Sequence, residues 1–322
     1  MTLFHRRDPI SDGGTPVRRV QLMRLYRQAC LLELEALKPG NVHRYASGHG
    51  MCVEDFVHSV EASVAPLTES GVGLGARIHG AVAATREAVG CNTNLGILLL
   101  CAPLVQAALD PCPTRGLRDR LAEILRTAGA EDTDWLFRAI RLAAPGGLGT
   151  APRHDVHDGA GAPLVEVMAS AASWDRIARQ YATDYADLFE VALPLSVDLD
   201  GRWLDQAWST AVLYLELLAR WPDSHIARKQ GAETADEVRE RAAVLLDEVR
   251  RAEHPRMRRA ELLAFDRELK DAGINPGTSA DLTVATRLLR GLETAASAFE
   301  PTAASRRLSD VPAGGCATGI CS

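Results

Sequence analysis

The chain has 322 residues, of which 47% are hydrophobic, 5% aromatic and 24% charged, and its formal net charge is −6. This composition is ordinary for a soluble globular protein, and the acidic balance argues against nucleic-acid and membrane partners, which need a positive surface. Alanine, leucine and arginine favour helices, whereas strands are enriched in aromatic and β-branched residues. We therefore expect an all-α protein.

The predicted helices begin with 17–37, where apolar residues recur at helical spacing up to Pro39. Segments 53–69 and 73–89 are amphipathic, and the nearly continuous apolar run 95–109 predicts a buried central helix. Further helices are predicted over 115–128, 133–143, 163–192, 202–221, 231–252, 256–272 and 279–298, with Pro145, Pro194, Pro222, Pro255 and Pro276 as breaks.

No long linker divides this pattern, so we expect a single helical domain over 16–299 with flexible ends over 1–15 and 300–322. The first residues lack the apolar core of a secretory signal, and no segment is apolar for long enough to span a membrane. Seven cysteines do not suggest a disulfide framework, and we expect a cytoplasmic location. Cys316 and Cys321 could bind a metal or oxidise, but two cysteines alone are weak evidence.

Five polar motifs punctuate the helical pattern, at 38–43, 92–96, 146–156, 223–229 and 275–282. Each lies at the end of an apolar segment. Helix ends carry unpaired backbone NH or C=O groups, so each motif can present a ligand-binding surface. We predict that these helix-end loops form one polar pocket.

In the first motif, Lys38 and His43 flank a Pro-Gly turn that also carries Asn41. We expect all three to contact a ligand. Glu33 and Glu35 lie on the preceding helix, two residues apart, and therefore at most one of them can face the same site.

Asn92 and Asn94 directly precede the apolar helix 95–109. One side chain can cap that helix by accepting a hydrogen bond from a free NH group. A second asparagine exceeds what a cap needs, and the positive end of the helix dipole favours an anion such as phosphate. We expect both asparagines to bind the ligand.

His154 and Asp155 follow a glycine-rich loop containing Gly147, and His157 and Asp158 come after the intervening Val156. A glycine loop can approach phosphates closely, and carboxylate and imidazole ligands suit Mg²⁺. A solvated loop is the alternative interpretation.

Asp223 and His225 are followed by Arg228 and Lys229, which places an acid, an imidazole and two cations within about two helical turns. The two cations can neutralise a polyphosphate. Asp223, together with Asp155, is our predicted Mg²⁺ ligand.

In the last motif, Thr278 can cap a helix and Asp281 can complete an acidic variant of the capping box. Capping alone would explain both residues. A role in binding or catalysis for Asn275, Ser279 and Asp281 requires that they face the cavity of the other motifs.

Taken together, the motifs at 38–42, 92–96, 223–229 and 275–282 resemble, in order and spacing, those of the triphosphoribosyl-dephospho-CoA synthase family. The resemblance covers residues 20–298 and implies an all-helical fold. It also implies a reaction that joins C1′ of the ATP ribose to the 2′-hydroxyl of 3′-dephospho-CoA and releases adenine. The implied product is a prosthetic-group precursor for citrate lyase and malonate decarboxylase, so a downstream prosthetic-group transferase would be a partner.

This chemistry builds oxocarbenium character at the ribose carbon, which a carboxylate can stabilise while a general base activates the acceptor hydroxyl. The intact triphosphate needs Mg²⁺ and cations. The candidate catalytic residues are Asp155, Asp223, Asp281, His154 and His225. The candidate ligand-binding residues are Lys38, Asn41, His43, Asn92, Asn94, Gly147, Arg228, Lys229, Asn275 and Ser279.

The chain departs from the usual family pattern at three places. Residues 92–96 read Asn-Thr-Asn-Leu-Gly where better-known members have Asn-Thr-His-Lys-Gly, and residues 39–43 read Pro-Gly-Asn-Val-His in place of Pro-Gly-Leu-Val-Asp. At 49–51, His-Gly-Met lacks the usual acid before the methionine. The chain is similar to a divergent branch with members in archaea and in organisms that use tetrahydromethanopterin. Two alternatives stay open: a related ribosyl or nucleotide-dependent transferase with a different acceptor in one-carbon cofactor biosynthesis, and a non-catalytic helical nucleotide-binding protein.

Overall fold

The computed structural model describes residues 15–110, 115–150, 153–159 and 161–299. These ranges are helical and contain no strand, which confirms the all-α prediction. In chain order the helices are α1 (Thr15–Glu35), α2 (Val53–Leu67), α3 (Leu74–Val89), α4 (Leu95–Leu109), α5 (Leu117–Thr127), α6 (Ala130–Ala143), α7 (Leu164–Ala171), α8 (Arg176–Ala182), the π-helix η1 (Asp187–Ala192), α9 (Leu193–Trp203), α10 (Gln206–Arg220), α11 (Ser224–Gln230), α12 (Ala232–Arg251), the 3-10 helix η2 (Pro255–Arg258), α13 (Arg259–Asp271) and α14 (Gly277–Phe299).

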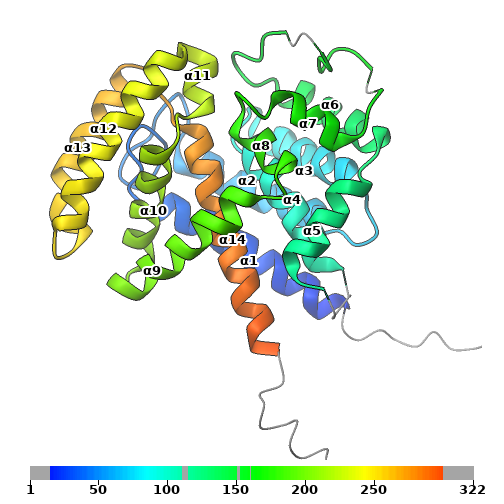
Figure 1. Cartoon of the computed structure of the whole chain (residues 1–322), viewed down its shortest axis with the longest axis horizontal. Helices are drawn as coiled ribbons and strands as arrows, with labels where there is room; N and C mark the ends of the chain where they lie inside the picture. The colour runs from blue at the N-terminus through cyan, green and yellow to red at the C-terminus, as the bar shows by residue number, and fades with distance from the viewer. Residues whose placement is uncertain (1–14, 111–114, 151–152, 160, 300–322) are drawn as a thin grey trace, which may run out of the picture.

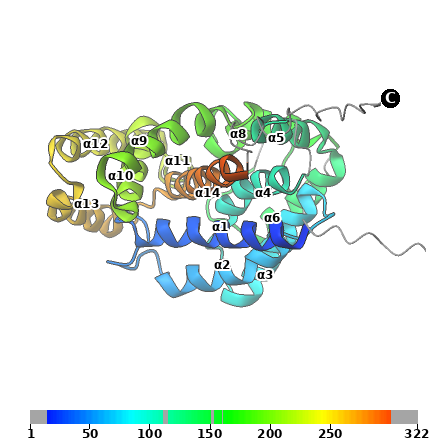
Figure 2. The same ribbon diagram turned by 90° about the horizontal axis from the view of Figure 1, so that it is seen from below.

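Two long helices, α1 and α14, contact each other and form the spine of the domain. Figure 1 shows α14 between two groups of helices, with α2 to α8 on one side and α9 to α13 on the other. In the view of Figure 2, α1 runs along the molecule, with α2 and α3 next to it and with α12 and α13 at the far end. Both groups therefore meet where α14 begins and along its length.

Helix α4 is the predicted central helix, and its residues from Leu95 to Ala108 are almost all buried. It packs against α1, α2, α3, α5, α8 and α14. Pro103 has no NH group, so the carbonyl of Leu99, one turn earlier, cannot form its helical hydrogen bond. The buried Tyr181 hydroxyl donates to that carbonyl at 2.6 Å. The proline in α4 is thus accommodated by a side chain from α8.

Replacing Tyr181 by phenylalanine is expected to lower the free energy of unfolding by about 1 kcal/mol, because a buried carbonyl loses its best donor. Urea unfolding of the variant and wild type would measure this difference. Tyr45→Phe is the control, because Tyr45 is exposed and its hydroxyl makes no hydrogen bond within the described residues. Equal stability of all three proteins would contradict the role given to the Tyr181 hydroxyl.

The prediction of one helix over 163–192 is wrong, because the segment is divided into α7, α8 and η1. Asp175 caps α8 by accepting hydrogen bonds from the NH groups of Ile177 and Ala178, both at 2.9 Å. Asp184 and Tyr185 adopt left-handed backbone conformations, with φ of 48° and 59°. Apolar spacing continues through both turns, so periodicity alone could not reveal them.

Two helices were not predicted, α9 and α11. Pro194 was interpreted as a break, yet it lies in the first turn of α9, where no NH group is needed for the helix. Within the described ranges, no helix has the length and hydropathy needed to cross a bilayer. The predicted flexible ends fall outside the described residues, except for Thr15, and so do Cys316 and Cys321.

Candidate active site

A cavity of about 980 Å³ opens between the two groups of helices. One part of its wall is polar and comes from the loop after α1 and from the beginnings of α4, α11 and α14. The other part is largely apolar and comes from α6, α7 and α8. In Figure 1, α11 lies at the top of the left-hand group of helices, and α6 and α7 lie at the top of the right-hand group.

The first turns of α4, α11 and α14 converge on the polar wall. The first turn of a helix has unpaired NH groups, which give it a partial positive charge. Two glycines allow the close approach of these turns. A Cβ atom on Gly96 would overlap Oδ2 of Asp281, and a Cβ atom on Gly277 would overlap Nδ1 of His225.

Asp281 lies on the wall of the cavity, and its carboxyl group makes no hydrogen bond to the described residues. Burial raises its pKa well above the ordinary value, and the nearby acids Asp223 and Glu33 raise it further, although Arg228 and Lys38 oppose the shift. This carboxyl group therefore holds its proton to a higher pH than an ordinary aspartate. It is the described acid best suited to exchange a proton with a ligand.

Asp223 does not line the cavity, contrary to the prediction, and is only 2% exposed. Its Oδ1 accepts hydrogen bonds from the NH groups of His225 and Ile226, at 2.9 and 3.1 Å. Its Oδ2 accepts from the NH and Oγ of Ser279, at 2.7 and 2.8 Å. These four bonds use the acceptor capacity of the carboxylate, so Asp223 joins α11 to α14 and has no lone pair left for a metal.

The capping box predicted for α14 is not formed. The helix begins at Gly277, and the Thr278 hydroxyl accepts a hydrogen bond from the NH of His225 at 3.2 Å and bonds the Ser224 hydroxyl at 3.0 Å. The Thr278 hydroxyl is therefore hydrogen-bonded to the start of α11 and does not cap α14. Asp281 is consequently free to face the cavity.

His225 lines the cavity as a neutral imidazole. Burial and the cations Arg228 and Lys229, with a further contribution from His49, lower its pKa to about 3. Its Nε2 is buried and has no hydrogen-bond partner among the described residues. A neutral ring cannot donate a proton as a strong acid near pH 7, but its Nε2 can form one hydrogen bond with a ligand.

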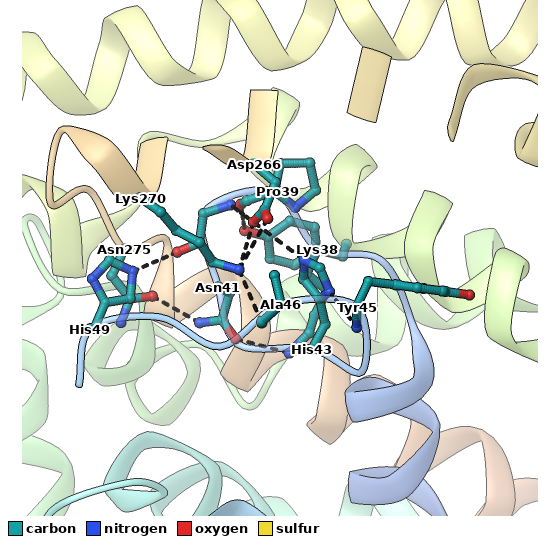
Figure 3. Close-up of polar contacts among 12 residues, drawn as sticks. Lys38, Pro39, Asn41, His43, Tyr45, Ala46, His49, Asp266, Lys270 and Asn275 are labelled. Atoms are coloured by element: carbon teal, nitrogen blue, oxygen red, sulfur yellow. Dashed lines mark hydrogen bonds and ion pairs between the residues drawn. The ribbon is translucent and has the colours of Figure 1, made fainter. Parts of the chain in front are cut away.

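Lys38 is fully buried and does not reach the cavity. It forms an ion pair with Glu33 and donates a hydrogen bond to Oδ1 of Asn41 at 2.8 Å. Asn41 in turn donates to Oδ1 of Asn275 at 2.8 Å, as Figure 3 shows. Burial lowers the pKa of Lys38 and raises that of Glu33, and the ion pair opposes both shifts. Lys38 thus orients Glu33 and Asn41, which do line the cavity.

Asp266 of α13 holds the loop that contains these residues, and no sequence motif included it. It accepts a hydrogen bond from the NH of Gly40 at 2.9 Å, pairs with Lys270 at 2.9 Å, and lies 3.3 Å from Nε2 of His43 (Figure 3). Burial, which raises the pKa of Asp266, is outweighed by His43 and Lys270, so that the pKa is lowered. His43, predicted as a ligand contact, is instead buried as part of this clamp.

The two asparagines before α4 have different positions. Oδ1 of Asn92 accepts a hydrogen bond from the NH of Leu95 at 3.2 Å, and the same residue lines the cavity. Asn94 turns inward and donates to the Thr85 hydroxyl at 3.2 Å. Only Asn92 can therefore contact a ligand in the cavity.

His154 and Asp155 also line the cavity, whereas Gly147 does not, although its neighbours Gly146 and Leu148 do. Oδ1 of Asp155 accepts a hydrogen bond from the NH of His157 at 2.9 Å. No group of three His, Cys, Asp or Glu side chains suited to a metal ion occurs in the described ranges. Of the two predicted Mg²⁺ ligands, Asp155 lies in the lining of the cavity, whereas Asp223 is buried and fully hydrogen-bonded.

Four exposed cations line the cavity: Arg86, Arg153, Arg228 and Lys229. None forms an ion pair with a carboxylate in the part of the chain that the structure describes. Such cations can bind phosphate groups without first breaking an internal ion pair. Arg228 and Lys229 were predicted, but Arg86 and Arg153 were not. Arg86 lies outside the polar motifs, and Arg153 lies in the motif at 146–156 but was not singled out there.

The structure thus brings together nine of the fifteen predicted site residues. They are Asn41, Asn92, His154, Asp155, His225, Arg228, Lys229, Asn275 and Asp281. Lys38, His43, Asn94, Gly147, Asp223 and Ser279 lie outside the lining of the cavity.

Comparison with known proteins agrees with this architecture. A structure from Archaeoglobus fulgidus, described as a candidate triphosphoribosyl-dephospho-CoA synthase, is 22% identical to the chain, covers 75% of it and 98% of its own chain, and has a TM-score of 0.56. This likeness supports the fold. No curated protein matches significantly. A family profile described as ATP:dephospho-CoA triphosphoribosyl transferase matches residues 19–299. The chain therefore belongs to that transferase family.

Proposed function

We propose that the protein transfers the 5-triphosphoribosyl group of ATP to the 2′-hydroxyl of 3′-dephospho-CoA and releases adenine. Membership of the family supports the reaction class. The observation that carries the assignment to this cavity is the unpaired Asp281 carboxyl group in the same lining as four exposed cations. Transfer from a nucleoside triphosphate needs a proton-exchanging group for the departing base and cations for the phosphates.

In this reaction the bond between C1′ and N9 of ATP breaks, and a bond forms between C1′ and the acceptor oxygen. The acceptor hydroxyl loses one proton and adenine gains one, so the transfer is balanced without a redox partner. Asp281, whose raised pKa keeps it protonated at higher pH, is the proposed acid that protonates adenine as it leaves. Asn41, Asn92 and Asn275 line the cavity and are the proposed contacts for the hydroxyl groups and base edges of the ligands.

Mg²⁺ is proposed to enter with the triphosphate of ATP and not to reside on the protein. Mg²⁺ usually keeps several waters and binds through substrate phosphates together with one or two carboxylates. Of the two predicted Mg²⁺ ligands, Asp155 and Asp223, only Asp155 lines the cavity, and it is the proposed carboxylate for this role.

The decisive test is chromatographic detection of free adenine after incubation of the purified protein with ATP and Mg²⁺, with and without dephospho-CoA. Adenine released only in the presence of dephospho-CoA, together with a product of matching mass, is the expected result. The Asp281→Asn protein, purified in the same way, controls for contaminating hydrolases. Release at the same rate without an acceptor would indicate a hydrolase and contradict the transferase.

A different acceptor is the second candidate. It is favoured by Asn94 and Leu95, which stand where better-known members have histidine and lysine. Here Asn94 turns away from the polar wall toward Thr85, and Leu95 is the first residue of α4. If adenine forms only with another hydroxyl-bearing cofactor precursor, this candidate replaces the first. A downstream prosthetic-group transferase is a proposed partner only for the first.

A further inference from the structure

Trp174 differs from the other tryptophans of the chain in contacting neither an aromatic ring nor a cation among the described residues. Of the five tryptophans, all lie in the described ranges. Four are packed against a ring or a cation: Trp135 against His79 and Arg138, Trp203 against His254 and Arg202, Trp208 against His254, and Trp221 against Arg176. Trp174 makes neither kind of contact with the described residues, and it is 60% exposed.

Trp174 lines the cavity. It lies in the turn between α7 and α8, where its backbone NH donates to the carbonyl of Ala171 at 3.1 Å. Met168 and Ala171 of α7 and Ile177 of α8 line the same apolar part of the cavity. Trp174 is therefore the exposed end of a continuous apolar surface, not an isolated surface residue.

The backbone around Trp174 fixes the position of the ring's attachment. Asp175, the next residue, caps α8 through two hydrogen bonds of 2.9 Å, and the turn is closed by a second bond from the NH of Asp175 to Ala171 at 2.9 Å. A rigid turn that presents a flat ring to a cavity loses little conformational entropy when a ligand binds. Such a platform suits a planar partner.

We infer that Trp174 is the stacking platform for an adenine ring in this cavity. This inference rests on the proposed function, which brings two adenine-containing ligands to the site. A purine ring presents a flat face to the indole, and the exposed cations in the same lining can hold the phosphates of the same nucleotide. The adenine ring comes either from ATP or from dephospho-CoA, and the two sources predict different outcomes.

The test compares Trp174→Ala, Trp174→Phe and wild type by titration calorimetry with ATP and dephospho-CoA separately. Loss of a base stack weakens binding about 5- to 100-fold, so the alanine variant is expected to show this increase in Kd for one of the two ligands, whereas phenylalanine retains most of the affinity. Because Trp174 is exposed, the variants should fold. Leu204→Ala, at a residue 89% exposed and outside the lining of the cavity, is the control.

Inorganic triphosphate serves as the probe without a base, and its Kd should be the same in the alanine variant and wild type. Weaker binding of ATP alone identifies the donor base, and weaker binding of dephospho-CoA alone identifies the acceptor base. Unchanged Kd values for both nucleotides, or an equal loss for inorganic triphosphate, would overturn the inference while leaving the proposed function intact. If wild type binds neither nucleotide, the proposed function fails, and this inference fails with it.

Discussion

Asp281→Asn is expected to reduce the rate of adenine release by about 10²- to 10⁴-fold, the usual contribution of a general acid or base. The amide has the same shape but cannot give up a proton to the leaving base. Initial rates at saturating ATP and dephospho-CoA would measure the loss. Asp198→Asn makes the same chemical change at an exposed site on α9 and should leave the rate unchanged.

The same variant should be at least as stable as wild type near neutral pH. Since the pKa of Asp281 is raised in the folded state, that state binds the proton more tightly than the unfolded chain does. Stability from this group is then present at low pH and is lost as the pH rises from the ordinary carboxyl pKa to the raised one. Asparagine removes this dependence, so the advantage of the variant should grow as the pH rises above the ordinary range of an aspartyl carboxyl group.

Two results would assign Asp281 a different role. A variant with near-normal turnover would show that the acid is elsewhere in the cavity. A thermal midpoint well below that of wild type would instead make Asp281 a structural residue. In wild type, the rate should also decline at alkaline pH as the protonated form disappears, and this decline should lie above the ordinary range of an aspartate.

Asp223→Ala has the opposite expected signature, a loss of stability of about 3 to 5 kcal/mol. The substitution removes the cap of α11 and leaves the buried NH groups of Ile226 and Ser279 without their acceptor, while the NH of His225 keeps only its 3.2 Å bond to the Thr278 hydroxyl. Asp223→Asn should cost less, because its remaining oxygen can still cap α11 while its NH₂ group faces the NH of Ser279. Urea unfolding of both variants would measure this graded series.

Asp205→Ala is the matched control for Asp223→Ala. Asp205 caps α10 through one hydrogen bond, to the NH of Trp208 at 3.2 Å, and joins no second helix. Its loss should cost about 1 kcal/mol. If Asp223→Ala is no more destabilising than this control but abolishes turnover, then Asp223 acts in the chemistry, as the sequence motif suggested.

Most helices were predictable because each buries one apolar face, and the unbroken apolar run of α4 indicated its central position. The polar wall was predictable for a related reason. Polar residues directly before an apolar helix end up at its first turn, and the first turns of α4, α11 and α14 meet. Asn92, His225 and Asp281 reached the cavity in this way.

The remaining features depend on contacts between distant segments. Asp266 and Lys270 are spaced like an ordinary surface ion pair, and nothing near them in the chain indicates that they hold Gly40. Asp223 and Asp281 look equivalent as carboxylates beside helix starts. They differ because Asp223 is hydrogen-bonded by Ser279, whereas the missing side chain of Gly96 leaves room for the Asp281 carboxyl group beside the cavity. Nothing in the sequence distinguishes Trp174 from a tryptophan of the hydrophobic core.

The clamp formed by Asp266 on the loop after α1 also determines when the cavity can form during protein synthesis. Gly40 and its acceptor Asp266 are 226 residues apart, and Asn275, which holds Asn41, emerges later still. On the ribosome, α1 and its loop therefore leave the exit tunnel long before their partners exist. Until then, the nascent chain contains Glu33 and Lys38 but neither Asp266 nor Asn275. The wall of the cavity can be completed only when the segment from α13 to the start of α14 has been made.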